Sequence, residues 1–230
     1  MKWAVIAFPG TNCDEDTRYL LAERLGQSAR VIWHQETRVG DADLVVLPGG
    51  FAHGDYLRCG AIARFSPVMD AVREHAERGR TVLGICNGMQ ILTEAGLLPG
   101  VLLRNQSLEY RCHWTHLRVH APDRAFLGHT PAGAVLRMPI SHGEGRYQCA
   151  PQEAEAMLAN GQVLLRYCDE RGAVNQAGDP NGATAGIAGL RNARGNVFGL
   201  MPHPERACDP LLGGEDGLVI FRSLIEAMHE

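Results

Sequence analysis

The sequence predicts an α/β fold, a doubly wound, mostly parallel sheet with an antiparallel hairpin extension. Short apolar runs such as Leu44 to Leu47 are continuous instead of alternating, which is typical of strands buried on both faces of a parallel sheet. Segments with helix start and stop signals follow several of these runs, as expected for β–α units. Between residues 102 and 150 polar and apolar residues alternate instead, which indicates antiparallel hairpins beside the main sheet.

The first half of the chain supplies the predicted β–α units in order. After an apolar first strand, either Thr11 or Asn12 can cap a helix. Ser66-Pro67 is typical of an N-cap followed by the first helical residue, and Gly79 ends that helix. The predicted strands span residues 2–8, 29–33, 44–47 and 81–85. The first predicted helix carries Tyr19, Leu20 and Leu25, and the next two span residues 67–78 and 87–95.

The second half of the chain returns to the pattern of buried strands after the hairpins. Strands are predicted at residues 162–167, 183–190 and 197–201. The chain closes with a helix that carries one apolar stripe, made of Leu218, Phe221, Leu224, Ile225 and Met228. Because no internal repeat or flexible linker interrupts these elements, we expect residues 1–230 to form a single domain.

The composition excludes several classes of function. Hydrophobic residues make up 45% and charged residues 21% of the chain, which predicts a folded protein and not a disordered one. A net charge of −4 without a run of Lys or Arg argues against nucleic acid as the main ligand. Lys2 is the only lysine, so a Walker A phosphate-binding loop is excluded. No apolar run approaches the ~20 residues that cross a bilayer, so we expect no membrane association.

The cysteines predict a reducing environment. Seven of them are scattered over the chain without a Cys-x-x-Cys pair, and an odd number at such spacing is a poor disulfide framework. We therefore expect a cytoplasmic protein.

The most informative stretch is the G-x-C-x-G pattern of residues 84–88, where a predicted strand runs directly into a helix around Cys86. It is the cysteine counterpart of a nucleophile elbow, in which small residues let strand and helix approach closely while the nucleophile sits on a strained turn. The positive end of the helix dipole favours a thiolate, and the N–H groups there can stabilise an oxyanion. A buried structural cysteine in a glycine-rich turn is the alternative.

Two further motifs lie at predicted strand ends. Gly49 and Gly50 follow the strand at 44–47, and the Gly50 N–H with that of Asn87 could form a pair of oxyanion donors. His203 follows the strand at 197–201, and Glu205, facing the same side of an extended segment, could orient its imidazole as a base toward the thiol. In open α/β sheets ligands bind at the carboxyl ends of strands, so the three motifs together predict a cysteine nucleophile site.

These motifs, in this order and spacing, resemble those of the class I, triad-type glutamine amidotransferases. The segments AFPGTNCDEDT, PGGFAHGDYLRCGAIAR, GICNGMQIL, SHGEGRY and GLMPHPER are further similar to glutaminase subunits of the purine-pathway synthetase that makes formylglycinamidine ribonucleotide. The resemblance covers essentially the whole chain and implies a flavodoxin-like fold. Ala52-His53 departs from the Ser-Tyr pair expected there. This difference affects what the resemblance implies for the loop, but not what it implies for the catalytic triad.

The resemblance also implies roles for individual residues. Cys86 would attack the glutamine carboxamide, His203 would serve as acid and base, and Glu205 would orient it, with Gly50 and Asn87 as oxyanion donors. The residues implied in binding glutamine are Gly49, Gln90, Ser141 and His142. The ammonia would pass to a larger synthetase subunit that uses ATP and Mg, and a small accessory protein would complete the complex. No cofactor or metal is implied for this chain.

Parts of the sequence also suggest other sites and other functions. Cys112, His113, His116 and His120 suggest a metal site, but His116 and His120 on one strand would lie ~13 Å apart, too far to share a zinc ion. The acidic residues 14–16 could bind a cation, but acidic residues in the first turn of a helix complement its dipole, which explains them better. A stand-alone cysteine hydrolase, such as a peptidase or γ-glutamyl hydrolase, and a non-catalytic subunit that has kept the fold are the alternative functions.

Overall fold

The computed structural model describes residues 1–228, which fold into two compact units. The first unit consists of Met1–Pro99 and Asn192–Gly199, and the second consists of Gly100–Arg191 and the chain from Leu200 onward. The expectation that residues 1–230 form a single domain stays a prediction. In the part of the chain that the structure describes, no helix is both long enough and apolar enough to cross a membrane.

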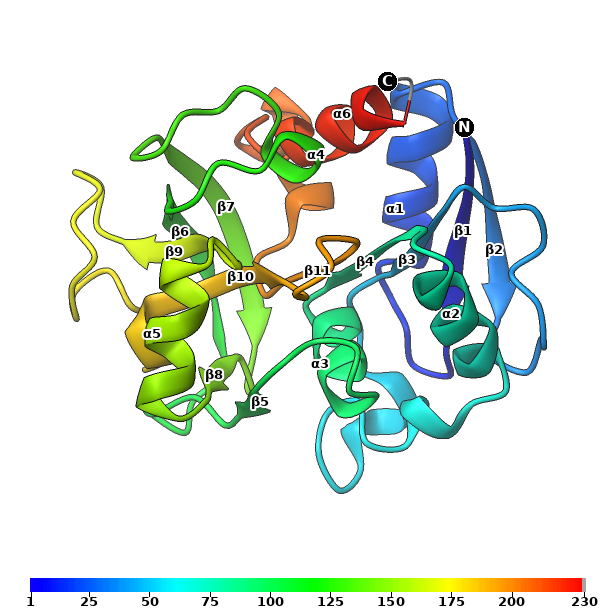
Figure 1. Cartoon of the computed structure of the whole chain (residues 1–230), viewed down its shortest axis with the longest axis horizontal. Helices are drawn as coiled ribbons and strands as arrows, with labels where there is room; N and C mark the ends of the chain where they lie inside the picture. Colours follow the sequence, from blue (N-terminus) through cyan, green and yellow to red (C-terminus); the bar gives the residue numbers. More distant parts are fainter. Residues whose placement is uncertain (229–230) are drawn as a thin grey trace. The chain divides into compact units, whose positions relative to one another are not determined.

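The first unit contains the predicted parallel sheet (Figure 1). Its strands are ordered β2-β1-β3-β4-β11, the order of a flavodoxin-like sheet with β11 in the fifth place. The pairs β1–β2, β1–β3 and β3–β4 are parallel. The strands are β1 (Lys2–Ala7), β2 (Ser28–Trp33), β3 (Leu44–Leu47), β4 (Thr81–Ile85) and β11 (Val197–Leu200).

Burial follows the position of each strand in this sheet. All four residues of β3 are fully buried, as the continuous apolar run predicts. The expectation of a buried strand at residues 29–33 was wrong, because β2 lies at the edge of the sheet and of its residues only Ile32 is buried. At the beginning of β1, Lys2 forms an ion pair with Asp41, and its backbone N–H donates to Asp43 Oδ2 at 2.8 Å.

Three helices pack on the strands of the first unit. Helix α1 (Asp14–Tyr19) contacts β1 and β2, α2 (Val68–Glu77) contacts β4, and α3 (Asn87–Glu94) contacts β3 and β4. Helix α1 is not capped by Thr11 or Asn12, because the Thr11 hydroxyl instead accepts a hydrogen bond from the Phe8 N–H at 2.9 Å and closes the turn after β1. A π-helical segment, Leu20–Arg24, continues α1.

The second unit is built on antiparallel strands, which confirms the predicted extension. Their order is β10-β9-β6-β7, and β5 and β8 form a separate antiparallel pair. The strands are β5 (Val101–Leu103), β6 (Arg111–Val119), β7 (Val135–His142), β8 (Arg146–Gln148), β9 (Val163–Cys168) and β10 (Ile187–Arg191). The first part of the strand expected at 183–190 is instead a 3₁₀ turn, Thr184–Gly186, in which Ala185 has a φ of 54°.

Helices complete the second unit. Helix α6 (Leu218–Ala227) corresponds to the predicted C-terminal helix and packs on α4 (Arg124–Leu127). Its predicted stripe is buried at Leu218, Phe221 and Leu224, whereas Met228 follows the helix and is exposed. Helix α5 (Pro151–Ala159) lies between the predicted hairpin segment and the strand predicted at 162–167, where no element was predicted. Together the parallel and antiparallel sheets with their helices confirm the predicted α/β class.

Candidate active site

Cys86 occupies the turn between β4 and α3, with φ 49° and ψ −106°. This is a left-handed conformation that L-residues adopt at a cost on the order of 1–3 kcal/mol, and the G-x-C-x-G pattern predicts strain at this residue. The Cys86 side chain is buried, and its carbonyl accepts the N–H of Gln90 at 3.1 Å as the helix begins. Because α3 starts at Asn87, the Asn87 N–H belongs to the first turn, whose N–H groups have no acceptor within the helix.

The two glycines of the pattern are required by close backbone approach. A Cβ on Gly88 would lie 1.8 Å from the Leu47 carbonyl oxygen, so α3 passes directly over the end of β3. A Cβ on Gly84 would lie 2.6 Å from Leu92 Cδ1 and 2.8 Å from the Gly88 carbonyl carbon. Only hydrogen at both positions lets strand and helix meet at the angle that holds Cys86 in the turn.

The Gly49-Gly50 pair is fixed by the loop that follows β1. The Gly49 carbonyl accepts the Cys13 N–H at 3.2 Å, and the Phe51 N–H donates to the Gly10 carbonyl at 2.9 Å. Gly50 has a φ of 153°, and a Cβ there would lie 2.6 Å from Thr11 Cα. Sequence reasoning missed this partnership. The adjacency of β1 and β3 in a doubly wound sheet could have indicated it, because their carboxyl ends meet at one edge.

The segment after Phe51 is held in a strained conformation next to the turn around Cys86. His53, Asp55 and Leu57 all have positive φ, at 54°, 54° and 70°. The His53 N–H donates to the Pro9 carbonyl at 2.6 Å, and the Ala52 N–H donates to Asn87 Oδ1 at 3.0 Å. The side chain of Asn87 therefore holds this loop, a contact that the sequence alone did not predict.

Gln90 lies one helical turn beyond Cys86, as expected, but its side-chain oxygen already accepts a hydrogen bond. Asn87 Nδ2 donates to Gln90 Oε1 at 2.9 Å, and both side chains are buried. Its implied part in binding glutamine stays a prediction.

In the second unit, His203 and Glu205 form the expected hydrogen bond. His203 Nδ1 and Glu205 Oε1 are 2.6 Å apart, and both side chains are buried. The local backbone differs from the expectation, because Pro204–Arg206 is a 3₁₀ turn and not an extended segment. Hydrogen bonds fix the turn at both ends. The His203 N–H donates to the Pro139 carbonyl at 2.8 Å, and Cys208 Sγ donates to the Glu205 carbonyl at 2.8 Å. With Nδ1 engaged by the carboxylate, Nε2 is the nitrogen left for proton transfer.

Ser141 and His142, at the end of β7, belong to the same unit as His203. Asn105 fixes the His142 ring, because its Nδ2 donates to the His142 carbonyl at 2.9 Å while its Oδ1 lies 3.0 Å from His142 Nδ1. Oδ1 also accepts the N–H of Gly145, so the Asn105 oxygen is the acceptor and His142 Nδ1 carries the hydrogen. Ser141 Oγ lies 2.7 Å from the hydroxyl of Tyr110. Neither Asn105 nor Tyr110 was singled out from the sequence.

Burial sets the protonation of His142. Burial and the neighbouring His203 and His113 lower the pKa of His142 to about 3. The ring is therefore neutral near pH 7, and its Nε2 is a buried acceptor without a hydrogen-bond partner among the described residues. A neutral acceptor of this kind suits an ammonium or amide donor of a ligand.

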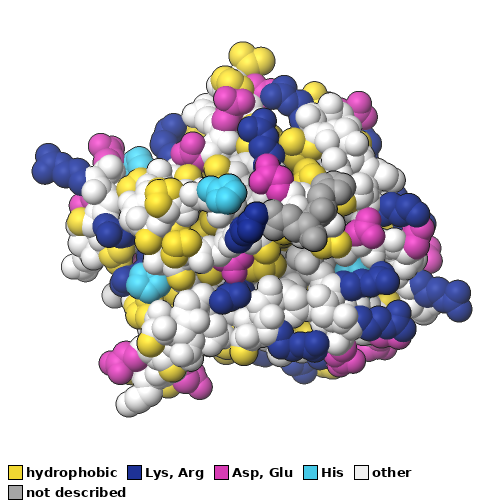
Figure 2. Space-filling view, turned by 45° about the horizontal axis from the view of Figure 1, so that its top comes forward, with side chains coloured by type: hydrophobic (Ala, Val, Ile, Leu, Met, Phe, Trp, Pro, Cys, Tyr) yellow, Lys and Arg dark blue, Asp and Glu magenta, His cyan; other side chains and the backbone are white. Residues whose placement is uncertain are grey.

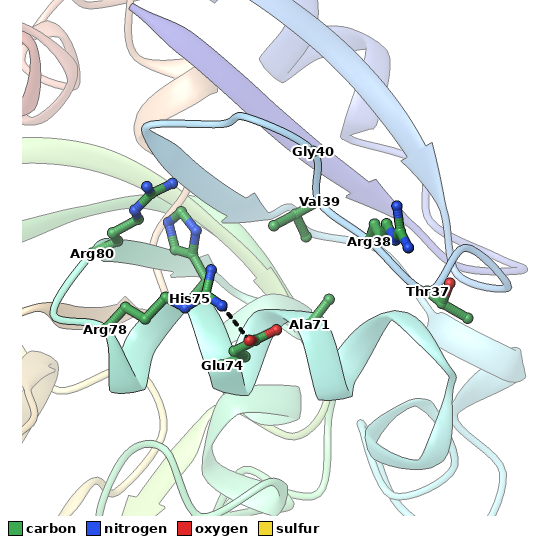
Figure 3. A pocket seen from close by; sticks show the side chains of 9 residues that line it. All are labelled: Thr37, Arg38, Val39, Gly40, Ala71, Glu74, His75, Arg78 and Arg80. Atoms are coloured by element: carbon green, nitrogen blue, oxygen red, sulfur yellow. Dashed lines mark hydrogen bonds and ion pairs between the residues drawn. The ribbon is translucent and has the colours of Figure 1, made fainter.

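A separate cavity of about 380 Å³ lies in the first unit, between the loop at residues 37–40 and the end of α2 (Figure 3). Two of the arginines that line it are engaged by neighbours. Arg78 forms an ion pair with Glu74 at 2.5 Å, and Arg80 donates to the Ala42 carbonyl at 3.1 Å. Burial and these two arginines lower the pKa of His75, which also lines the cavity. None of the predicted site residues lines it.

On the face of the molecule in Figure 2, Lys and Arg side chains lie among Asp and Glu.

Comparison with known proteins places this geometry in a family. The model of the CobB/CobQ-like glutamine amidotransferase domain matches residues 1–213. A relative named phosphoribosylformylglycinamidine synthase subunit PurQ, from Synechococcus elongatus, is 54% identical over 226 residues, which cover 98% of this chain and 98% of the relative. The chain belongs to the PurQ family of glutamine amidotransferases.

Other members of the PurQ family agree. The PurQ protein of Acaryochloris marina is 50% identical over 228 residues, covering 99% of this chain and 97% of the relative. A chain in the structure of PurLQS from Thermotoga maritima is 40% identical and superposes with a TM-score of 0.87, covering 99% of this chain and 98% of that chain. The PurQ family therefore accounts for the whole length of this chain.

Proposed function

We propose that this chain hydrolyses L-glutamine to glutamate and ammonia as the glutaminase subunit of phosphoribosylformylglycinamidine synthase. Membership of the PurQ family supports the reaction class. The observation that carries the proposal is Cys86, held in a strained turn between two glycines that admit no side chain. A structural cysteine has no need of such a conformation, whereas a nucleophile does.

In the proposed mechanism the Cys86 thiolate attacks the carboxamide carbon of glutamine. The resulting oxyanion is stabilised by the N–H groups of Gly50 and Asn87. His203 gives a proton to the departing nitrogen, so ammonia leaves and a γ-glutamyl thioester remains. His203 then takes a proton from water, which attacks the thioester and releases glutamate and the thiolate.

Glu205 and the substrate-binding residues support this sequence of steps. The 2.6 Å bond from Glu205 to His203 Nδ1 fixes the ring orientation and stabilises the imidazolium that forms. We assign glutamine binding to Gly49, Gln90, Ser141 and His142. The neutral His142 Nε2 would accept a hydrogen bond from a nitrogen of the substrate, since burial keeps the ring unprotonated.

The ammonia would be used by a partner. The name PurLQS of the Thermotoga maritima structure supports a complex with a large synthetase subunit and a small accessory protein. In that complex the synthetase would use ATP and Mg to convert formylglycinamide ribonucleotide into the amidine. None of the seven cysteines, all of which lie within the described residues 1–228, is paired with another in a disulfide, which supports a cytoplasmic location.

Substitution of the nucleophile tests the proposal. In the complex with the synthetase subunit, Cys86→Ala should abolish glutamine-dependent synthesis, while added ammonium still supports it at the wild-type rate. Assays of both nitrogen sources on the same preparation measure this directly. Glutamine-dependent activity retained by Cys86→Ala would refute the assignment of the nucleophile.

A further inference from the structure

The side chain of Asn87 connects α3 to the loop at residues 52–55 in the first unit. Its Oδ1 accepts the Ala52 N–H at 3.0 Å, and its Nδ2 donates to Gln90 Oε1 at 2.9 Å and to Asp55 Oδ1 at 3.3 Å. The orientation of the carboxamide is unambiguous, because a backbone N–H can only donate and a carboxylate can only accept. With 1% of its surface exposed, Asn87 is one of the most deeply buried polar residues of the chain.

These contacts join the two backbone segments that carry the proposed oxyanion donors. One donor is the N–H of Asn87 itself, at the beginning of α3. The other is the N–H of Gly50, only two residues before Ala52. A hydrogen bond from Ala52 to the Asn87 side chain therefore fixes the spacing of the two donors. Oxyanion stabilisation depends on donors that are already in place, and a displacement of about 1 Å can reduce the rate on the order of 100-fold.

The loop at residues 52–57 needs such a restraint. His53, Asp55 and Leu57 have positive φ, so the isolated segment would relax toward ordinary backbone conformations. Asn87 contacts this loop at its backbone, through Ala52, and at a side chain, through Asp55. These two contacts bracket the strained residue His53 and oppose a change in its conformation.

We propose that the Asn87 side chain is a positioning residue, which holds the loop at 52–55 against the nucleophile turn so that both oxyanion donors stay in register. The proposal rests on the proposed glutaminase function. The positioning role requires a side chain that accepts a hydrogen bond from the Ala52 N–H and at the same time donates one to Asp55. A carboxamide does so and a carboxylate does not.

The first test is Asn87→Asp, which keeps the shape and the acceptor but replaces the donor by a second carboxylate beside Asp55. In the complex with the synthetase subunit we expect kcat for glutamine hydrolysis to fall on the order of 10- to 100-fold near pH 8, with little change in KM. Ammonium-dependent synthesis should stay at the wild-type rate.

The pH profile of this variant distinguishes a loss of donor positioning from a general disturbance of the fold. Two adjacent carboxylates repel, and the pair takes up one proton more readily than either group alone. The shared proton restores an O–H donor between the two side chains. The ratio of variant to wild-type kcat should therefore rise as the pH is lowered from about 8 to 5.5. A ratio that does not change with pH would overturn the proposal.

A double variant offers rescue. Adding Asp55→Asn to Asn87→Asp restores one amide and one carboxylate with their positions exchanged, so the new amide can donate to the new carboxylate. We expect kcat of the double variant near pH 8 to be at least tenfold higher than kcat of Asn87→Asp. A double variant no faster than the single one would contradict the proposal.

Two further variants guard against misfolding. Asn196 is another buried asparagine of this unit, whose Nδ2 donates to the carbonyls of Ala76 and Arg80 at 2.8 and 2.9 Å. Asn196→Asp should lower the melting temperature as Asn87→Asp does, but leave kcat unchanged. If Asn87→Asp does not fold, Asp55→Ala, at a partly exposed loop position, should still lower kcat several-fold without changing KM.

The proposed function and this proposal fail separately. If Cys86→Ala kept glutamine-dependent activity, the glutaminase assignment itself would be wrong. If Cys86→Ala were inactive and both Asn87→Asp and Asp55→Ala kept the wild-type kcat, only the positioning role of Asn87 would be refuted.

Discussion

Gly88 shows how one hydrogen atom decides the geometry of the nucleophile turn. We expect Gly88→Ala to destabilise the chain by about 2–4 kcal/mol, because the added Cβ would lie 1.8 Å from a backbone oxygen of β3 that has no room to move. Gly96→Ala is the matched control, since Gly96 also lies in the α3 region, has a φ of 71° and has no atom within 4 Å of an added Cβ. It should cost only about 1 kcal/mol, from its backbone conformation alone. Urea denaturation of both variants measures the difference, and equal losses would contradict the steric argument.

His142 gives the chain a specific dependence on pH. Its pKa is about 3 in the folded chain and about 6.5 when unfolded. The unfolded chain therefore binds the proton more readily, so the stability contributed by the neutral ring is complete above pH 6.5 and is lost as the pH falls toward 3. Within that window the free energy of unfolding should rise with pH by up to about 1.4 kcal/mol per pH unit from this residue.

Replacement of His142 isolates this effect from those of the other histidines. His142→Gln should flatten the plot of unfolding free energy against pH between 4 and 6, even if it lowers stability at every pH by disturbing Asn105. Urea denaturation across this range provides the slopes. An unchanged slope would mean that the ring is not held neutral in the fold.

At the scale of the element, the 3₁₀ turn Pro204–Arg206 brings Glu205 Oε1 to 2.6 Å from His203 Nδ1. We expect Glu205→Gln, measured in the synthetase complex, to reduce kcat for glutamine by a factor on the order of 10² to 10⁴, because a neutral amide neither holds the ring tautomer nor stabilises the imidazolium. Ammonium-dependent synthesis serves as the internal control and should be unaffected. Wild-type kcat in this variant would remove Glu205 from the mechanism.

The strands and helices of the first unit were largely predictable because their signals are local. Residues 44–47 and 81–85 are strands with the bounds that their apolar runs predict, and α3 ends within one residue of the prediction. Helix α5 was missed because its signal is weak. Its Pro151 and Glu153 mark a helix start, but only Ala154 and Met157 are buried, so no apolar stripe accompanies them. Strand β2 was assigned as buried because a run of apolar residues does not reveal which strand forms the sheet edge.

The site residues likewise divide into those with a local signal in the sequence and those without one. Cys86, Gly84 and Gly88 could be found because a nucleophile turn constrains neighbouring residues in sequence. Asn105 and Asp55 could not, because their roles arise from contacts with residues 37 and 32 positions away in the chain, to His142 and Asn87 respectively. The His203–Glu205 bond was predicted correctly from an incorrect backbone, since both an extended segment and a 3₁₀ turn can bring residues i and i+2 together.

For the molecule as a whole, the seven thiols differ widely in access. Cys112 on β6 is exposed, Cys59 and Cys149 are half-buried, and the other four are buried. Burial, with the nearby Glu153, raises the pKa of Cys149, which slows its reaction further. A bulky maleimide should therefore modify Cys112 first, with one fast equivalent on the native chain and seven after unfolding. Mass spectrometry of the Cys112→Ser variant checks this, and an undiminished fast phase would contradict it.

The single lysine has a practical consequence. Lys2 is the only lysine of the chain, and it lies where β1 begins. Cys86, in contrast, follows β4, which runs parallel to β3, and β3 runs parallel to β1, so the lysine and the thiol lie at opposite ends of these strands. Immobilisation through the Lys2 side chain would thus leave the thiol end of the strands directed toward the analyte.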